Sequence, residues 1–517
     1  MVDPPDAHAG TPAAPLSRDT LRRELRSEFR RAMGLTALGT VMPGAGLTQT
    51  RSNRLGWGVL AVAVMGGLVI IYYVTSQGVT DAALTVVAST TTLQAAAIVL
   101  VAVGVLWCAT IVLTAVQARP ARLDAPRTRM LAVFTTVMVL VVAAASVTAV
   151  QYVTITKDTV AQVFQTAPPE PGATPAVVAT TGDDPWADTP RVNILLLGSD
   201  AGVGREGTRT DSMIVASIDT KSGNAVLISL PRNLQNVPLA PDSKLRKLYP
   251  SGTYGSPVCF RAQSDPADQC MLNAIWTEVD QYQNDHPGTW TTPVPGRAET
   301  RSAISQVIGL KIDQTVVIDL KGFQQLIDAM GGVDINVKLS ATGTPLPIGG
   351  HADGQGNITG VTGYLKPGPQ HLDGYHALWY ARTRAADTDG YRQARQRCVV
   401  QAVVRQVNPA SMVAKYPEIA KIAKNNIYTD IPAQSLPAFV ELAKRLQHGK
   451  ITNVSITPED GFNSVRPDYD KIHQLIEKAI KPPKPKAGGS ASKTPTTSKT
   501  TSTPATPSPT ATPYSQC

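Results

Sequence analysis

The arginines of residues 380–397 have the types and spacing that most clearly predict chemistry in this chain. Five arginines and two aspartates lie within these eighteen residues. Two residues of the segment, Arg392 and Gln396, share a helical repeat with three later valines: Val399, Val403 and Val407. This repeat predicts the buried face of a helix. A buried arginine needs an anionic partner, because an unpaired buried charge is very costly. Since the guanidinium fork matches phosphate oxygens, the segment predicts an anion site, for phosphate.

Two aspartates and a further arginine lie next to the ends of predicted strands. Apolar runs predict strands at residues 192–197, 213–218 and 225–230. If these strands form an antiparallel meander, Asp200, Asp211 and Arg232 meet at one edge of the sheet. Two carboxylates beside an arginine suit Mg²⁺ and a bound phosphate. Alternatively, Asp200 belongs to a strand-end turn and Asp211 pairs with Arg209.

Strands and helices alternate through residues 191–480. A further strand is predicted at 314–320, followed by a helix at 321–330 that Gly331 and Gly332 end, and by a strand at 333–337. Two helices are predicted later, at 373–380 and 391–407. This alternation predicts an α/β fold with a mixed central sheet flanked by helices.

Three long apolar runs precede this domain. Residues 55–76, 93–116 and 130–153 contain no Lys, Arg, Asp or Glu, and each exceeds the roughly 20 residues that cross a bilayer. The alternative, a set of buried core helices, rarely produces three uncharged runs of this length. A cleavable signal peptide is not expected, because the first run begins after some fifty residues.

Flanking arginines predict how these three helices are oriented. Eight arginines precede residue 55, none lies in the loop 77–92, and four lie in the loop 117–129. The positive-inside rule therefore places the N-terminus and the second loop in the cytoplasm, and everything after residue 153 outside. The net charge of +9 by itself would suit nucleic acid, a membrane surface or an anionic substrate. This topology argues against nucleic acid as a partner.

The five cysteines fit an extracytoplasmic domain. Cys259 and Cys270 are close together in a loop-like segment and are candidates for a disulfide. Cys108 lies within the second apolar run, Cys398 is expected to be a buried free thiol, and Cys517 has no clear role. A zinc site is not expected, because no histidine or cysteine cluster has ligand spacing.

The sequence therefore divides into five regions. The first is expected to be cytoplasmic and mostly disordered, with a short helix at 17–33 that either lies against the inner leaflet or is solvated. It is followed by three transmembrane helices, an extracytoplasmic linker, the α/β domain and a disordered tail rich in Pro, Ser and Thr. These regions are residues 1–54, 55–153, 154–190, 191–480 and 481–517.

Several motifs occur together in a characteristic order. They are Asn193-Ile-Leu-Leu-Leu-Gly-Ser-Asp200, Arg209-Thr-Asp211, Ser229-Leu-Pro-Arg232, Gly331-Gly-Val333, and Tyr380-Ala-Arg-Thr-Arg384 with Asp389 and Arg392-Gln-Ala-Arg-Gln-Arg397. In this combination the chain resembles the LytR-CpsA-Psr family of bacterial cell-wall glycopolymer transferases over residues 191–410. The resemblance implies that family's fold, anchored in the membrane with the domain outside. One departure is Asn233, where the family often has aspartate.

The resemblance also implies an activity and roles for the residues. Family members bind a polyprenyl-pyrophosphate-linked glycan, transfer it as a phosphodiester to a peptidoglycan hydroxyl and release polyprenyl phosphate; many are also pyrophosphatases. Carried over, Asp200 and Asp211 would bind Mg²⁺ (or Mn²⁺), and Asp211 and Arg232 would be catalytic. The pyrophosphate would be held by Arg209, Arg382, Arg384, Asp389, Arg392 and Gln396.

Two other functions stay open from the sequence. One is a polyprenyl-pyrophosphate phosphatase with water as the acceptor, and the other is a non-catalytic membrane regulator or wall-binding module. The aspartate pair disfavours the regulator, since pure binding does not need a metal. Two arginines stay outside the predicted contacts: Arg395 and Arg397 are expected only to pair with Asp387 or to face solvent.

Overall fold

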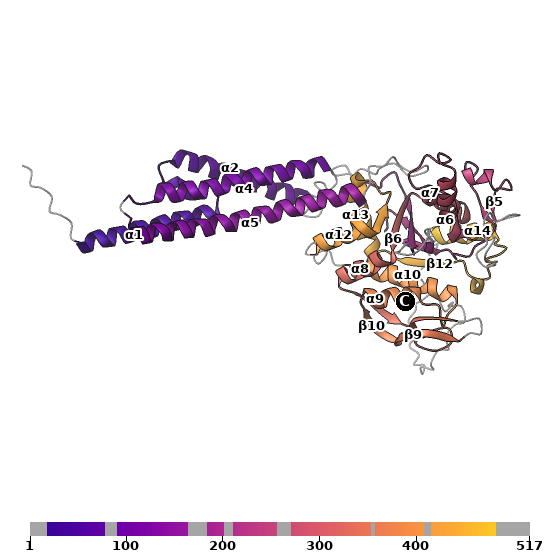
Figure 1. Cartoon of the computed structure of the whole chain (residues 1–517). Coiled ribbons are helices and arrows are strands. Elements are labelled where there is room, and N and C mark those ends of the chain that lie inside the picture. The colour runs from indigo at the N-terminus through magenta and orange to yellow at the C-terminus, as the bar shows by residue number, and fades with distance from the viewer. Residues whose placement is uncertain are drawn as a thin grey trace, which may run out of the picture. The chain divides into compact units, whose positions relative to one another are not determined.

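The computed structural model (Figure 1) describes residues 18–77, 90–121, 123–163, 184–200, 210–255, 270–352, 357–407 and 415–481. The chain forms two compact units, Met1–Lys157 and Asp158–Cys517. The first unit holds the long apolar helices, and the second holds the sheet and its flanking helices.

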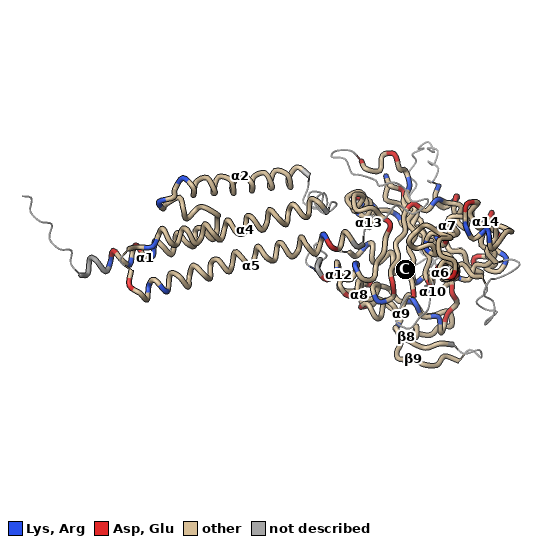
Figure 2. The backbone as a smooth tube through the Cα atoms, turned by 45° about the horizontal axis from the view of Figure 1, so that its top comes forward, with Lys and Arg blue, Asp and Glu red and all other residues tan. Residues whose placement is uncertain are grey.

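The N-terminal unit contains three helices that are long and apolar enough to cross a membrane. They are α2 (Asn53–Gln77), α4 (Thr90–Ala118) and α5 (Ala125–Val163). Their outward side chains are apolar and exposed; Tyr72, for example, is 74% exposed. Figure 2 shows almost no charged residues along the middle of these helices. Such surfaces need an apolar surrounding, because water would hydrate them unfavourably. Each of the three predicted apolar runs lies within one of these helices.

The predicted helix at 17–33 forms and extends to residue 41, whereas the expectation of disorder is wrong for residues 34–49. Helix α1 (Arg18–Val41) and the short helix η1 (Ala45–Gln49) fold onto α4. The indole Nε1 of Trp107 donates a hydrogen bond to the Gly39 carbonyl at 2.9 Å, and Leu35 and Leu47 are buried. The packing of small and apolar side chains in the second half of α1 offsets the entropy of ordering this segment.

The C-terminal unit is built on a mixed six-stranded sheet. Its strand order is β11-β6-β1-β2-β3-β12, in which β1, β2 and β3 are antiparallel neighbours while β6 and β12 run parallel to β1 and β3. The strands are β1 (Arg191–Ser199), β2 (Thr210–Asp219), β3 (Ala225–Ser229), β6 (Gln314–Asp319), β11 (Ile427–Thr429) and β12 (Ile451–Ser455). The structure therefore confirms the predicted mixed α/β fold and the β1–β2–β3 meander.

Both faces of this sheet are covered. Leu195 and Leu197 of β1 face a core with α6 (Ile275–Asp285), α7 (Pro295–Ile308) and α14 (Tyr469–Ile480). Alternate residues such as Val192 face a second core with α13 (Leu436–His448). Burial on both faces explains why β1 is a continuous apolar run rather than an alternating one.

A buried ion pair fastens α7 to the edge strand β11. Nη1 of Arg301 lies 2.9 Å from Oδ2 of Asp430, and both side chains are 4% exposed. Arg301 also donates to the carbonyls of Ile312 and Asp313, and Asp430 accepts from the backbone N–H of Thr315. These additional hydrogen bonds offset part of the cost of burying the two charges.

A smaller layer lies beside the sheet and holds the helices of the site. It contains α8 (Leu320–Met330), β7 (Val333–Val337), β8 (Leu346–Ala352), β9 (Ile358–Leu365), β10 (Gly368–Leu372), α9 (Gly374–Arg382) and α10 (Asp389–Gln406). Gly331 ends α8 with φ at 96°, a left-handed conformation that favours glycine. The predicted strand 333–337 forms, but it pairs with β10 in a separate two-stranded sheet.

Candidate active site

The strand ends of β1, β2 and β3 bring the predicted catalytic residues to one edge of the sheet. Nη1 of Arg232 lies 2.8 Å from Oδ1 of Asp211. Both side chains stay partly accessible, at 27% and 36% exposed. Arg232 follows β3, and Asp211 lies at the start of β2, so the antiparallel pairing of these strands is what joins them. The accessible pair can therefore meet a ligand.

Asp200 lies at the same edge. It directly follows Ser199, which pairs with Thr210, and Asp211 directly follows Thr210. The two aspartates thus flank one cross-strand pair, beside a register shift between Gly198 and Ser199. Asp200 is buried, at 8% exposed. Arg209, a predicted ligand of the pyrophosphate, lies outside the described residues.

The carboxylates fit a hard divalent cation that shares its ligands with a phosphate. Asp200 and Asp211 supply oxygen donors, which Mg²⁺ and Mn²⁺ prefer, and Mg²⁺ typically binds through one or two carboxylates while substrate phosphates and water complete its shell. Among the described residues no group of three or more His, Cys, Asp and Glu has the arrangement of a metal site.

The arginines of the α9–α10 turn gather around Asp389. Nη2 of Arg392 lies 2.8 Å and Nη1 of Arg384 lies 3.9 Å from Oδ1 of Asp389. Arg392 is 4% exposed and Arg384 is 46% exposed, so the group has a buried end and an accessible end. Gln393, which the sequence analysis did not single out, donates to Oδ2 of Asp389 at 2.9 Å. The structure thus places the predicted Arg384, Asp389 and Arg392 in one cluster.

This arginine cluster and the strand-edge pair act on each other electrostatically. Burial lowers the pKa of Arg392, and the positive charges of Arg384 and Arg232 lower it further while Asp389 and Asp211 oppose them. Burial also lowers the pKa of Arg384, and Arg232 adds to this effect. Cations this close repel one another, so an anion placed between them would be strongly favoured.

Buried polar atoms without hydrogen bonds accumulate around the same cluster. In the described part of the chain these atoms include Nε of Arg392, Oγ1 of Thr383, Oγ1 of Thr210 and Oε1 of Gln393. Leaving a buried donor unsatisfied costs about 1–3 kcal/mol, so native structures rarely keep several in one place. The donors among these atoms could bind an oxygen-rich anion, whereas Oε1 of Gln393 is an acceptor and needs a donor.

Arg382 and Gln396 lie near this cluster but contact it less directly. The guanidinium of Arg382 lies 5.4 Å from the centre of the Trp379 ring. Together with Arg384 and Asp389, Arg382 lines a hollow of about 470 Å³. Gln396 lies one helical turn after Arg392 and is half-buried. Arg382 can therefore reach a ligand in this hollow, outside the buried part of the cluster.

The last two arginines of the segment differ from each other. Arg395 pairs with Asp387, which was one of its two predicted states. It also donates to the carbonyls of Tyr380 and Thr383, so it fixes the α9–α10 turn. Arg397 does not face solvent: it is 1% exposed, and burial lowers its pKa to about 10 while Asp460 opposes the shift. Neither alternative for Arg397 is correct, because α10 is buried on more than one side.

The structure also corrects the prediction for Cys398. Cys398 is disulfide-bonded rather than a free thiol, whereas Cys108 is free. Cys270 is disulfide-bonded too, and Cys259, its predicted partner, lies outside the described residues. Oxidised cysteines suit an oxidising compartment.

Comparison with known proteins identifies the family of this chain. The LytR_cpsA_psr family model matches residues 147–480, which is more than half of the chain. The chain therefore belongs to the LytR_cpsA_psr family.

Two relatives and one solved structure illustrate the similarity. The polyisoprenyl-teichoic acid–peptidoglycan teichoic acid transferase TagV of Bacillus subtilis is 28% identical over 272 residues, which are 52% of this chain and 57% of the relative. The enzyme of the same activity named TagU from Oceanobacillus iheyensis is 30% identical, over 47% of this chain and 60% of its own length. The crystal structure of B. subtilis TagV has a TM-score of 0.37 at 24% identity and covers 56% of this chain and 97% of that one. The chain spans under two thirds of the length of these two relatives.

Proposed function

We propose that this protein transfers a glycopolymer from a polyprenyl-pyrophosphate carrier to a hydroxyl group of peptidoglycan, forming a phosphodiester and releasing polyprenyl phosphate. The observation that carries this proposal is that the Asp211–Arg232 pair at the strand ends and the Arg384–Asp389–Arg392 cluster are close enough to influence each other electrostatically. Membership of the LytR_cpsA_psr family and the names of the relatives, which are teichoic acid transferases, support it.

The proposed reaction requires positioning and charge neutralisation more than covalent help from the protein. The oxygen of the acceptor hydroxyl attacks the phosphorus bonded to the first sugar. The bond from that phosphorus to the bridging oxygen breaks, polyprenyl phosphate leaves with the bridging oxygen, and the hydroxyl proton is released. Arg232 stabilises charge on the transferred phosphoryl group, held in place by Asp211, while Arg384 and Arg392 bind the leaving phosphate.

Asp200 and Asp211 would hold Mg²⁺ or Mn²⁺, which neutralises phosphate charge when bound. The two aspartates lie on either side of the cross-strand pair Ser199–Thr210, and this placement supports the assignment.

Transfer can be measured with the full-length protein in detergent, given a labelled glycan on polyprenyl pyrophosphate and purified peptidoglycan. We expect label in the peptidoglycan together with free polyprenyl phosphate, loss of both after EDTA, and recovery with Mg²⁺ or Mn²⁺. Release of polyprenyl phosphate without labelled peptidoglycan would instead establish a phosphatase that uses water. Full activity in EDTA would contradict the metal assignment.

The orientation of the chain follows from the same proposal, because the acceptor lies outside the cytoplasm. Alkaline phosphatase fused after residue 165 is expected to be active, and a fluorescent protein fused there to be dark. Matched fusions after Asp124, between α4 and α5, should give the opposite pattern. If the phosphatase were active at Asp124 and inactive at 165, the topology would be the reverse of the predicted one. That result would contradict the proposed acceptor.

A further inference from the structure

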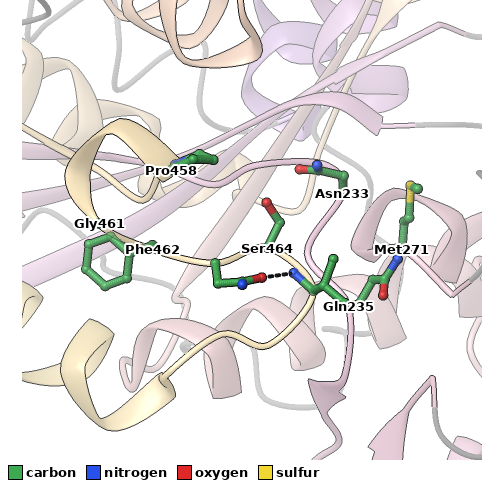
Figure 3. Close-up of a pocket in the computed structure, with 9 residues that line it drawn as sticks. Asn233, Gln235, Met271, Pro458, Gly461, Phe462 and Ser464 are labelled. Carbon is green, nitrogen blue, oxygen red and sulfur yellow. Dashed lines mark hydrogen bonds between the residues drawn. The ribbon is translucent and has the colours of Figure 1, made fainter.

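A pocket next to the phosphate site has a different chemistry from that site. It is a hollow of about 640 Å³ between the segment after β3 and the loop after the short helix η6 (Pro458–Asp460) (Figure 3). The argument below uses six of its residues: Asn233, Gln235, Met271, Phe462, Asn463 and Ser464. We call it the amide pocket.

One wall of the amide pocket begins next to a residue of the candidate active site, and the other is hydrogen-bonded to a neighbour of that site. Asn233 directly follows Arg232, whose guanidinium pairs with Asp211. On the other wall, Oγ1 of Thr388 donates to Oε1 of Glu459 in η6 at 2.8 Å, and Thr388 directly precedes Asp389. A group bound in the pocket would therefore adjoin a phosphate held by the arginines.

The lining of the amide pocket is polar but uncharged. None of the nine described residues that line it is Lys, Arg, Asp or Glu. In the described part of the chain, the side-chain amides of Asn233 and Gln235 make no hydrogen bond, and Figure 3 shows the hydroxyl of Ser464 and the amide of Asn233 extending into the same space. Oδ1 of Asn463 accepts from the backbone of Val465, which leaves its NH₂ group for a ligand.

The pocket walls are held together by hydrogen bonds outside the ligand space. The backbone N–H of Gln235 donates to the carbonyl of Ser464 at 2.9 Å, and Nδ2 of Asn236 donates to the carbonyl of Val465 at 2.8 Å. The hydroxyl of Tyr469 donates to the carbonyl of Gln235 at 3.1 Å. The free amides thus project from a fixed frame, which lowers the entropy lost when a ligand binds.

This chemistry selects one kind of occupant. A charged group would find no counter-ion in the lining, and a hydrocarbon chain would strip water from amides without replacing their hydrogen bonds. A sugar ring carries hydroxyl groups that both donate and accept, as amides do, and C–H faces that can pack on Met271 and Phe462. We propose that the amide pocket is a carbohydrate subsite that binds a neutral sugar residue beside the transferred phosphate.

This inference rests on the proposed transferase function and extends it. The sugar has two possible sources: the first sugars of the donor glycan, or the peptidoglycan sugar that supplies the hydroxyl. The chemistry of recognition is the same for both, so kinetics must separate them.

The test uses full-length protein in detergent and the double variant Asn233→Ala/Gln235→Ala, whose removed amides make no hydrogen bond to described residues. Gln306→Ala, a half-buried amide on α7 outside the pocket, is the matched control. Losing two hydrogen bonds should raise one KM on the order of 10-fold in the double variant and leave the control unchanged. A higher KM for the lipid-linked donor assigns the pocket to donor sugar. A higher KM for peptidoglycan, with donor hydrolysis unchanged, assigns it to the acceptor.

A binding measurement keeps the inference separate from the proposed reaction. Saturation-transfer NMR with an uncharged N-acetylglucosamine oligosaccharide should show binding to wild type and to Gln306→Ala, and a loss of signal in the double variant. If the protein had no transferase activity, this result alone would still support the subsite. Unchanged KM values together with no difference in NMR signal between the double variant and the control would overturn it.

Discussion

Replacing Arg232 by alanine is expected to lower the rate of glycan transfer by on the order of 10²–10³-fold, with little change in the KM for the donor. The estimate follows from the loss of one preorganised donor aimed at charge that develops in the transition state. Arg232 is accessible at 27% and is held by Asp211 at 2.8 Å, so its guanidinium is fixed before substrate binds. The measurement is kcat and KM for transfer by the full-length protein.

A second arginine offers a matched control for this substitution. Arg191 also pairs with an aspartate of β2, Asp219, and its side chain is 23% exposed, but it lies at the opposite end of β1. Arg191→Ala should keep transfer within a few-fold of wild type, with thermal stability measured for both variants. Arg232→Lys should recover only part of the rate, because an ammonium lacks the planar fork. Equal activity of Arg232→Ala and Arg191→Ala would remove Arg232 from the chemistry and would favour a non-catalytic protein.

Replacing Asp430 by alanine is expected to destabilise the C-terminal unit by about 3–5 kcal/mol. The substitution leaves Arg301 as a buried charge without its carboxylate and leaves the N–H of Thr315 without its acceptor. The measurement is unfolding by urea in detergent, followed by tryptophan fluorescence, with the midpoint and slope compared with wild type.

The control for this prediction is an ion pair that is exposed. Glu477 and Lys481 lie 2.7 Å apart with side chains 62% and 66% exposed, and Glu477→Gln should leave the midpoint unchanged, since such pairs contribute little. The double variant Arg301→Met/Asp430→Leu should be more stable than Asp430→Ala, because it removes both buried charges. If Asp430→Ala unfolded at the wild-type midpoint, the pair would not be part of what holds β11 to the sheet.

Much of the fold could be predicted because local signals and tertiary burial agree. The apolar run of β1, the polar turn between β2 and β3, and the two glycines after α8 each favour the conformation that the structure adopts. The helix at 17–33 was predicted, but its continuation to Val41 as α1 and the following η1 were not. The order of residues 34–49 depends on contacts with α4, such as that of Trp107 with Gly39, which local sequence does not reveal.

The candidate site was predictable where a strand end or a helical repeat fixes a residue's position. Asp211 and Arg232 meet because antiparallel strands place their ends together, which the meander already implied. Gln393 was missed and Arg397 was wrongly expected to pair with Asp387 or face solvent, because one helical repeat marks a single buried face of α10. That helix packs against two hydrophobic cores, so more of its circumference is buried than one repeat predicts.

The sequence by itself determined the apolar helices, the mixed α/β fold and the chemical types of the candidate site, since each depends on residue type and local spacing. Only the tertiary structure decided how the arginines of residues 380–397 are arranged. Arg395 fixes a turn, Arg397 is buried beside Asp460, and Arg384 and Arg392 share Asp389. The tertiary structure also decided that Asn233 lines an uncharged pocket with a loop more than two hundred residues later. The physical reason is that burial and charge pairing depend on neighbours in space, which segments distant in the chain supply.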